Sequence, residues 1–462
     1  MASDMNDPND PLLDSLRAIV GADGALPQEE VSQRSAGFMR PDTLQARILV
    51  RPRCTAEVSA VLKLCHAAGQ PVVTHGGLTG LVHGGDAGPH ELILSLERMN
   101  AIEEIDPLQR VAVVQAGVIL QALQEAVERQ DLAFPLDLGA RGSATIGGVV
   151  ATNAGGNRVI RYGMTRSLVL GLEAVLADGR VVSSLNRMIK NNAGYDLKQL
   201  FIGSEGTLGV ITRVVLRLFE RPRSQDVAIV AVDSFAALTG FLKHIDSALG
   251  GSLSAFEAMW REFYQLVTTS PARSQPPLSG DHPYYVLVEA QGADQVNDSA
   301  RFKKALESAL ESGLISDAAI AHSARECAAI WALRDDVMQI TRHGWPVTFD
   351  VSLPIAAMEA YVADVRAALT AWPEHHCWVF GHLGDGNLHL AIHVPTEARA
   401  AVERIVYEPL AKIGGSVSAE HGVGLEKKPY LALCRNPGEI ALMRALKQCL
   451  DPNKLLNPGK IF

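Results

Sequence analysis

The sequence predicts an α+β protein with more than one domain. Its 462 residues exceed what a single hydrophobic core usually serves, so two or three domains are expected. Short β-branched runs alternate with segments of helical periodicity, and the composition changes near residues 220–222. Hydrophobic residues at 47% and charged residues at 20% are typical of a globular protein. We therefore expect an α/β first region, an α+β second region and a helical C-terminal segment.

Charge and composition argue against several classes of partner. The net charge of −9 is spread without long runs, which argues against nucleic acid. No apolar segment approaches the ~20 residues of a transmembrane helix. The acidic N-terminus lacks a signal-peptide pattern, and the six cysteines form no CxxC pair and are expected to be reduced. These features predict a cytoplasmic protein without a transmembrane segment.

A βαβ-like pattern follows a helical lead-in over residues 1–45. Thr55 is suited to cap the helix and Gly69 to end it. A short strand at 71–74 then enters the glycine-rich turn at 75–80. Consecutive amides in such a turn bind pyrophosphate, although an ordinary tight turn is the alternative. No strand-GxGxxG-helix pattern occurs here, so a Rossmann nicotinamide site is not expected.

The first region is centred on residues 134–156, which are rich in Gly, Ala, Ser and Thr and carry almost no charge. Such residues let the backbone lie close to a flat or phosphorylated ligand, so we interpret this stretch as a cofactor cradle. Strands at 91–99 and 111–120 and a helix at 121–130 come before it. After it come a hairpin with a type I′-like turn at Asp178-Gly179 and a glycine-punctuated turn at 203–209.

The second region alternates strands with amphipathic helices, including one near residues 299–312 after a polar loop at 268–281. Within it, GHLGDGNLH at residues 381–389 predicts a hairpin with a two-residue Asp-Gly turn.

That hairpin would set His382 opposite His389, with Asn387 on the same face. Cross-strand Cβ atoms lie only ~4.5–5.5 Å apart, so the two imidazoles predict a bidentate metal site. Glu420, in SAEHGVG, would add a carboxylate.

Six motifs in this order resemble those of the FAD-linked D-2-hydroxy acid dehydrogenases of the vanillyl-alcohol oxidase superfamily, and in particular the enzymes that oxidise D-2-hydroxyglutarate. They are the Gly76-Gly77 loop, PLDLGARGSATIGG, ATNAGG, GYDLKQLFIGSEGTLGVIT, GHLGDGNLH and SAEHGVG. The resemblance implies a PCMH-type FAD-binding domain of two α/β subdomains and an α+β substrate domain with an antiparallel sheet. The implied parts are a lead-in at 1–49, the FAD domain at 50–222, the substrate and metal-binding domain at 223–420, and a C-terminal segment at 421–462 that returns to the FAD domain.

The resemblance also implies where FAD binds. The pyrophosphate would lie in the turn at 74–80, and the isoalloxazine against the glycine-rich stretch and the turn at 203–211. The implied residues are Val73, Thr74, His75, Gly76, Gly77, Leu78, Thr79, Gly80, Pro135, Leu136, Asp137, Gly139, Gly142, Ser143, Ile146, Gly147, Gly148, Ala151, Thr152, Asn153, Gly155, Gly156, Glu205, Gly206, Gly209, Val210 and Ile211. Leu78 stands where members with covalent flavin often carry a histidine, so FAD is expected to be bound non-covalently.

For the chemistry, the resemblance implies that His382, His389 and Glu420 hold a divalent metal, zinc or manganese. The metal would lower the pKa of the substrate hydroxyl. His421 would act as general base while hydride passes to flavin N5. The implied substrate-binding residues are Arg334, Asn387, Arg342, Thr348 and Met338.

Two substitutions leave the substrate open. Thr348 stands where the hydroxyglutarate enzymes carry a lysine and Met338 where they carry a threonine, with Arg342 as a cation that could compensate. The substrate is thus 2-hydroxyglutarate or a similar acid, or alternatively D-lactate or a bulkier apolar D-2-hydroxy acid. A non-catalytic flavoprotein subunit is a third hypothesis. The expected partners are an electron-transfer flavoprotein or a quinone as electron acceptor, and a second copy in a homodimer.

Overall fold

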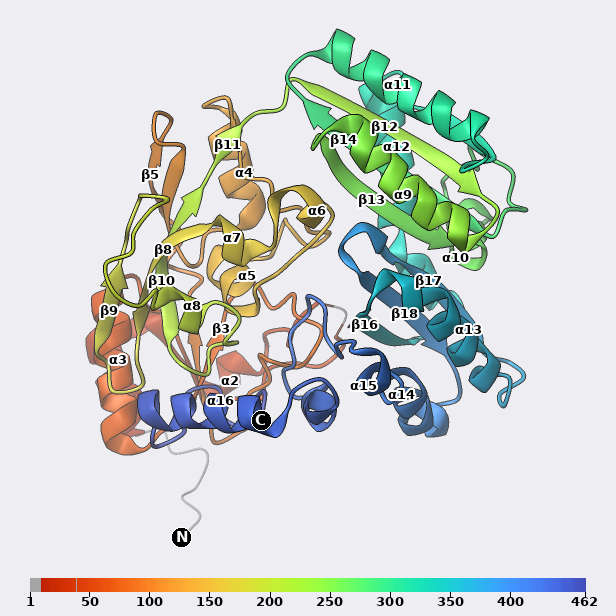
Figure 1. Ribbon diagram of the computed structural model, residues 1–462. Helices are drawn as coiled ribbons and strands as arrows, with labels where there is room; N and C mark the ends of the chain where they lie inside the picture. The colour runs from red at the N-terminus through yellow and green to blue at the C-terminus, as the bar shows by residue number, and fades with distance from the viewer. Residues whose placement is uncertain (1–9, 39) are drawn as a thin grey trace. The chain divides into compact units, whose positions relative to one another are not determined.

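The computed structural model describes residues 10–38 and 40–462 and divides into two compact units (Figure 1). Unit 1 comprises Met1–Ala154, Met164–Arg221 and Glu420–Phe462, and unit 2 comprises Gly155–Gly163 and Pro222–Ala419. Each unit has its own sheets.

A small, mainly parallel sheet begins unit 1, in the order β1-β2-β4-β3. Strands β2, β4 and β3 are parallel, and β1 is antiparallel to β2. The elements are α1 (Pro11–Val20), η1 (Ala22–Gly24), β1 (Ala25–Pro27), α2 (Gln28–Val31), β2 (Ile48–Val50), α3 (Thr55–Ala68), β3 (Val72–His75) and β4 (Leu92–Ser95). The predicted capping of α3 by Thr55 is wrong, because Cys54 is the N-cap residue and the Thr55 hydroxyl donates to Glu173 Oε1 at 2.6 Å. The helix ends at Gly69, whose φ of 62° suits glycine.

A five-stranded antiparallel sheet in the order β5-β6-β10-β8-β9 forms the second part of unit 1. Its strands are β5 (Ile102–Asp106), β6 (Val111–Gln115), β8 (Val169–Val175), β9 (Val181–Ser184) and β10 (Val210–Arg217). The other elements here are α4 (Leu120–Glu128), α5 (Ile146–Thr152), α7 (Thr165–Leu168), α8 (Lys198–Phe201) and the small pair β7 (Leu132–Ala133) and β11 (Phe219–Glu220). The predicted type I′ turn between β8 and β9 is wrong, because Gly179 has a positive φ and Asp178 does not.

The C-terminal segment packs within unit 1. It contains η6 (Lys428–Leu433) and α16 (Pro437–Leu450), whose N-terminus is closed by a capping box of Asn436 and Glu439. The buried ammonium of Lys447 donates to Thr207 O at 2.7 Å and to Leu456 O at 2.8 Å. These bonds hold α16 and the tail against the turn after α8.

Unit 2 is built on a seven-stranded antiparallel sheet in the order β15-β12-β14-β13-β17-β18-β16. Its strands are β12 (Ser224–Val232), β13 (Leu253–Trp260), β14 (Tyr284–Gly292), β15 (Asp317–Ile320), β16 (Val347–Ser352), β17 (His376–His382) and β18 (Asn387–His393). Its α-helices are α6 (Val159–Tyr162), α9 (Phe235–Leu249), α10 (Arg261–Thr268), α11 (Gln295–Glu311), α12 (Ala324–Asp335), α13 (Met358–Leu369), α14 (Arg399–Tyr407) and α15 (Leu410–Ile413). Its 3-10 turns are η2 (Val337–Thr341), η3 (Ile355–Ala357), η4 (Leu383–Asp385) and η5 (Thr396–Ala398).

The two faces of this sheet bury different helices. On one face, which we call the α12 face, α10 and α12 pack on an apolar cluster that includes Phe263, Leu287 and Phe380. On the other face α9 packs, with the rings of Phe241 and Phe256 5.7 Å apart, and α11 lies beside α9 (Figure 1). Because side chains alternate along a strand, the residue after Phe256 must point to the α12 face.

The predicted register of the β17–β18 hairpin is wrong by two residues. His389 lies opposite Phe380 rather than His382, because η4 and Gly386 make a longer connection than the expected two-residue turn. A slip by an even number of residues keeps every side chain on its predicted face. His382 and His389 therefore still share a face, and their ring centroids are 5.3 Å apart.

None of the described helices combines the length and apolar content that a membrane crossing requires. The six cysteines are free.

Candidate active site

Four polar side chains follow one another across the α12 face of the unit 2 sheet. In the strand registers, Glu257 of β13 lies opposite His382 of β17, and Asp350 of β16 lies opposite His389 of β18. Three of these side chains are almost fully inaccessible, with 0% of Asp350, 1% of Glu257 and 5% of His382 exposed. Buried carboxylates are stable only when charged or hydrogen-bonding partners surround them. We therefore interpret this row of side chains as a candidate functional site.

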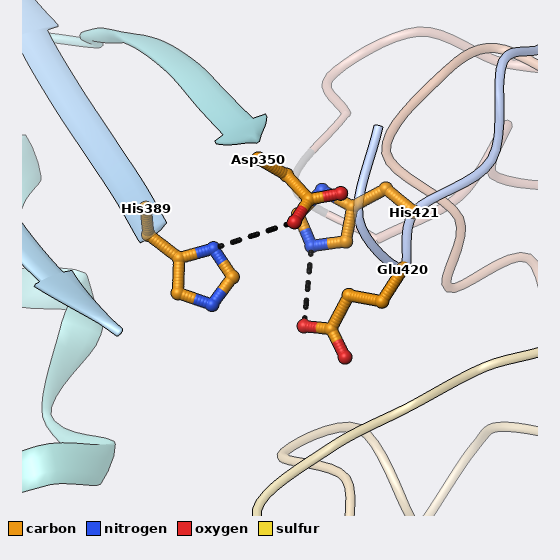
Figure 2. A group of neighbouring side chains, drawn as sticks. All are labelled: Asp350, His389, Glu420 and His421. Atoms are coloured by element: carbon orange, nitrogen blue, oxygen red, sulfur yellow. Dashed lines mark ion pairs between the residues drawn. The ribbon is translucent and has the colours of Figure 1, made fainter. Parts of the chain in front are cut away.

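Asp350 holds the chain at Ala419, immediately before two predicted site residues. Its Oδ1 accepts from Asn387 Nδ2 at 2.8 Å and its Oδ2 from the Ala419 amide at 3.1 Å. Glu420 and His421 follow Ala419 directly, so the peptide chain itself brings them beside Asp350. Figure 2 shows the resulting group, in which Asp350, His389, Glu420 and His421 each offer a ligand atom within 4.8 Å of the others.

The donor atoms of this group suit a divalent metal. Zinc and manganese accept imidazole nitrogen and carboxylate oxygen, and the group offers two of each. His389 Nδ1 lies 3.9 Å from Asp350 Oδ1, and His421 Nε2 lies 3.9 Å from Glu420 Oε1 (Figure 2). The carboxylates and imidazoles thus stand far enough apart for an ion to fit among them.

His382 is not one of those four residues, but its hydrogen bond is typical of a metal ligand. Its Nδ1 lies 2.6 Å from Glu257 Oε1. Metal-binding histidines usually donate one ring N–H to a carboxylate, which leaves the lone pair of the other nitrogen for the ion. Glu257 therefore fits the task of orienting His382 with Nε2 as the ligand atom.

The same carboxylate holds Arg334, which α12 places over the sheet. Arg334 Nε donates to Glu257 Oε2 at 2.8 Å, and the guanidinium carbon lies 4.8 Å from the Phe380 ring centroid. Burial raises the pKa of Glu257, but the charges of His382 and Arg334 outweigh it and lower the pKa below its ordinary value. Among the described residues, the hydrogen bonds of Arg334 involve Nε alone, so the Nη1–Nη2 fork is left for a carboxylate.

The remaining predicted substrate residues lie in different surroundings. Arg342 Nη2 donates to Leu266 O at 2.9 Å and to Thr269 O at 3.2 Å, both at the end of α10, and to Gln339 Oε1 of η2 at 2.6 Å. It is thus committed to the C-terminus of a helix. Thr348 is exposed on β16, two residues before Asp350, and Met338 is 46% exposed.

In unit 1, the two glycine-rich stretches predicted to bind FAD lie against each other. A Cβ on Gly77 would fall 1.9 Å from Ser143 O, and one on Gly76 would fall 2.5 Å from Thr145 Oγ1. Only glycine permits this approach. The hydroxyl of Thr74 is buried, and the described residues provide it with no hydrogen-bond partner. A cradle closed by glycines, with an orphaned donor on the strand that leads into it, fits the phosphate end of FAD.

Other predicted FAD residues brace this cradle. His75 Nε2 lies 2.7 Å from Gly85 O, and burial lowers its pKa to about 4, so the imidazole is neutral. Asp137 accepts from Arg141 at 2.7 Å. The predicted residues at 73–80, 135–153 and 205–211 belong to unit 1, whereas Gly155 and Gly156 belong to unit 2.

Sequence reasoning missed Asp350 and Glu257. Each is the single charged residue of its strand, in VTFDVS and LSAFEAMW respectively. A lone carboxylate in such a strand is expensive to bury and could have marked both positions as site residues.

Comparison with known proteins extends over nearly the whole chain. Residues 221–461 match the FAD-linked oxidase C-terminal domain, and residues 46–184 match an FAD-binding domain. A protein of Bos taurus named "D-2-hydroxyglutarate dehydrogenase, mitochondrial" is 42% identical over 94% of this chain and 80% of its own length. A protein of Xanthomonas citri pv. viticola named "D-2-hydroxyglutarate dehydrogenase" is 41% identical over 89% of this chain and 88% of its own length. A crystal structure of p-cresol methylhydroxylase with substrate bound superposes with a TM-score of 0.79, at 16% identity, over 98% of this chain and 96% of that one.

These names overturn one expectation. We predicted a cytoplasmic protein, and that prediction is wrong on this evidence, because several relatives, the Bos taurus protein among them, are named as mitochondrial. The relative from Xanthomonas shows that bacterial members also exist. Net charge and cysteine pattern cannot separate the two compartments, since both keep thiols largely reduced.

Proposed function

Because the chain belongs to the FAD-linked oxidases and is an FAD-dependent dehydrogenase with the PCMH-type fold, we propose that it oxidises a D-2-hydroxy acid to the 2-oxo acid. The observation that carries this proposal is the group of Asp350, His389, Glu420 and His421 beside the Glu257–Arg334 pair. It combines a base, metal-type donors and a guanidinium fork, which are the groups that a 2-hydroxy acid requires.

In this mechanism Arg334 binds the substrate carboxylate through Nη1 and Nη2, while Glu257 holds the guanidinium from behind. His421 Nε2 takes the proton of the 2-hydroxyl group as the C2–H bond breaks. The cradle residues of unit 1 would hold FAD non-covalently, and the flavin would supply the hydride acceptor. His382, His389 and Glu420, with Asp350 as a further donor, would hold a divalent metal that lowers the pKa of the hydroxyl. Asn387 orients Asp350.

The domain roles follow the same proposal. Residues 50–222 would bind FAD, residues 223–420 would bind the substrate, and residues 421–462 would return to the FAD domain. The clustering of Glu420–Phe462 with the first unit supports this division. The electron acceptor would be an electron-transfer flavoprotein or a quinone, and the protein would form a homodimer.

The direct test is flavin reduction without oxygen. Bleaching of the bound flavin should follow addition of D-2-hydroxyglutarate, D-lactate or a D-2-hydroxy acid with a bulky apolar tail, but not the L-enantiomers. Dithionite, which needs no active site, serves as the positive control. If dithionite bleaches the flavin and no D-acid does, the chain is the non-catalytic flavoprotein of our third hypothesis.

The substrate tail is the finer question, and the site favours an uncharged one. Arg342 is hydrogen-bonded to carbonyls at the end of α10. It therefore does not replace the lysine that the hydroxyglutarate enzymes carry at the position of Thr348. Met338 adds exposed apolar surface on η2, next to α12. A second carboxylate would enter with weak compensation, whereas an apolar tail leaves no cation unpaired.

We therefore expect Thr348→Lys to shift the preference toward D-2-hydroxyglutarate over D-lactate by about 10–150-fold in kcat/KM. A hydrogen bond to a charged group contributes roughly 1.5–3 kcal/mol, which corresponds to that range. Steady-state kinetics on both acids give the ratio. Thr348→Met is the matched uncharged control and should not shift it toward the dicarboxylate. Strict selectivity of the unmodified protein for D-2-hydroxyglutarate would contradict this view of the tail pocket.

A further inference from the structure

A buried glutamate of unit 1 holds the segment that follows His421. Glu205 was predicted to bind FAD, but its carboxylate accepts from two consecutive amides: Val423 donates to Oε1 at 2.7 Å and Gly424 to Oε2 at 2.8 Å. Only 9% of Glu205 is exposed. Burial raises the pKa of the carboxyl, and the two amides oppose that rise. Both oxygens are thus engaged with the backbone two and three residues beyond His421.

The local backbone is shaped for this contact. Gly422 has φ of 86°, and a Cβ there would stand 2.9 Å from Glu205 Oε1. Gly424 has φ of 52°, and its Cβ would stand 2.0 Å from Val82 O. Both glycines are required, because an L side chain would be strained and would collide. The glycines of SAEHGVG therefore let the chain close around a carboxylate.

The position of Glu205 is itself fixed at its backbone. Its N–H donates to Ala151 O of α5 at 2.8 Å, and its C=O accepts from Asn457 Nδ2 at 2.6 Å. The Oδ1 of the same Asn457 accepts from the Thr74 amide at 2.8 Å. One chain of bonds thus joins β3, α5 and the segment that carries Glu420 and His421.

We propose that Glu205 is a positioning residue, which sets where Glu420 and His421 stand by holding the Val423 and Gly424 amides. This rests on the proposed function, in which His421 takes the substrate proton. Misplacing a reacting group by ~1 Å can cost about 10²-fold in rate, so a lost tether should be visible in catalysis.

The test compares Glu205→Gln with Ser204→Ala in the FAD-loaded protein. The glutamine keeps the size but presents an N–H group to one of the two amides, which then loses its acceptor. Ser204 is the matched control: it precedes Glu205, is 7% exposed, and its hydroxyl bonds only to Phe201 O, within its own turn. Glu205→Asp keeps the charge with a shorter reach and should be intermediate.

Two readouts are needed, amide hydrogen exchange at residues 422–424 and substrate-driven flavin reduction. We expect Glu205→Gln to speed exchange at Val423 or Gly424 and to slow reduction about 10²-fold, with FAD content and dithionite reduction unchanged. Ser204→Ala should leave amide exchange at residues 422–424 unchanged. Exchange that stays slow in both Glu205 variants, or fast exchange with an unchanged reduction rate, overturns the proposal. If the unmodified protein shows no substrate-driven reduction, the proposed function fails, and exchange alone still decides whether the tether exists.

Discussion

Replacing His421 by asparagine should give a yellow protein that substrate no longer reduces. Asparagine keeps a polar side chain of similar size, but it cannot accept the proton of the 2-hydroxyl group. A positioned general base contributes about 10²–10⁴-fold, so flavin reduction by the best D-2-hydroxy acid should slow by that factor. Rapid-mixing measurements without oxygen give the rate directly, separately from reoxidation by an electron acceptor.

Three controls separate loss of the base from loss of the site. FAD content and bound metal should match those of the unmodified protein, because the cradle lies in other segments and the proposed metal-holding residues, His382, His389, Glu420 and Asp350, are unchanged. Dithionite should reduce the variant normally. A wild-type reduction rate in His421→Asn would show that another group takes the proton, with Glu420, its neighbour in the cluster, the first alternative.

Removing the imidazole of His389 should abolish metal binding and, with it, turnover. His389 is the donor that pairs across the strands with Asp350, and without it two carboxylates face each other with one imidazole fewer to complete the coordination. Exhaustive chelation of the unmodified protein should have the same effect while FAD stays bound. Elemental analysis and titration with Zn²⁺ or Mn²⁺ give metal content and affinity, and neither ion should restore His389→Ala.

Two further variants test whether the loss of metal is specific to the proposed site. Glu257→Gln should weaken metal affinity by about 10–100-fold, because the amide no longer dictates which nitrogen of His382 carries the proton. His393→Ala is the matched control, since His393 lies on the same face of β18 but about 13 Å further along the strand. Full activity with metal verified absent, or equal metal loss in His393→Ala, would refute the site.

Local patterns predicted most of the elements but not their exact pairing. In GHLGDGNLH the Asp-Gly signal indicated a hairpin correctly, and the face of His382 and His389 followed from alternation. The register did not follow, because the pairing of His382 with Glu257 of β13 and of His389 with Asp350 of β16 decides it. Those partners lie 125 and 39 residues away, beyond the reach of any turn rule.

The sequence by itself indicated the family, and it predicted the glycine-rich cradle and the histidine and glutamate pattern of the candidate site, because each is carried by a short motif whose backbone needs are local. Gly76 and Gly77, for example, can be recognised from the sequence as positions where the backbone can approach another segment closely. Only the tertiary structure showed which buried acids lie beside the predicted site residues and which groups each arginine contacts. Asp350, Glu257 and Glu205 find their hydrogen-bond partners on other strands and loops, and Arg342 donates to carbonyls at the end of α10. The reason is physical: a buried charge is stable only where distant segments supply its partners, and that meeting is a property of the fold rather than of any stretch of sequence.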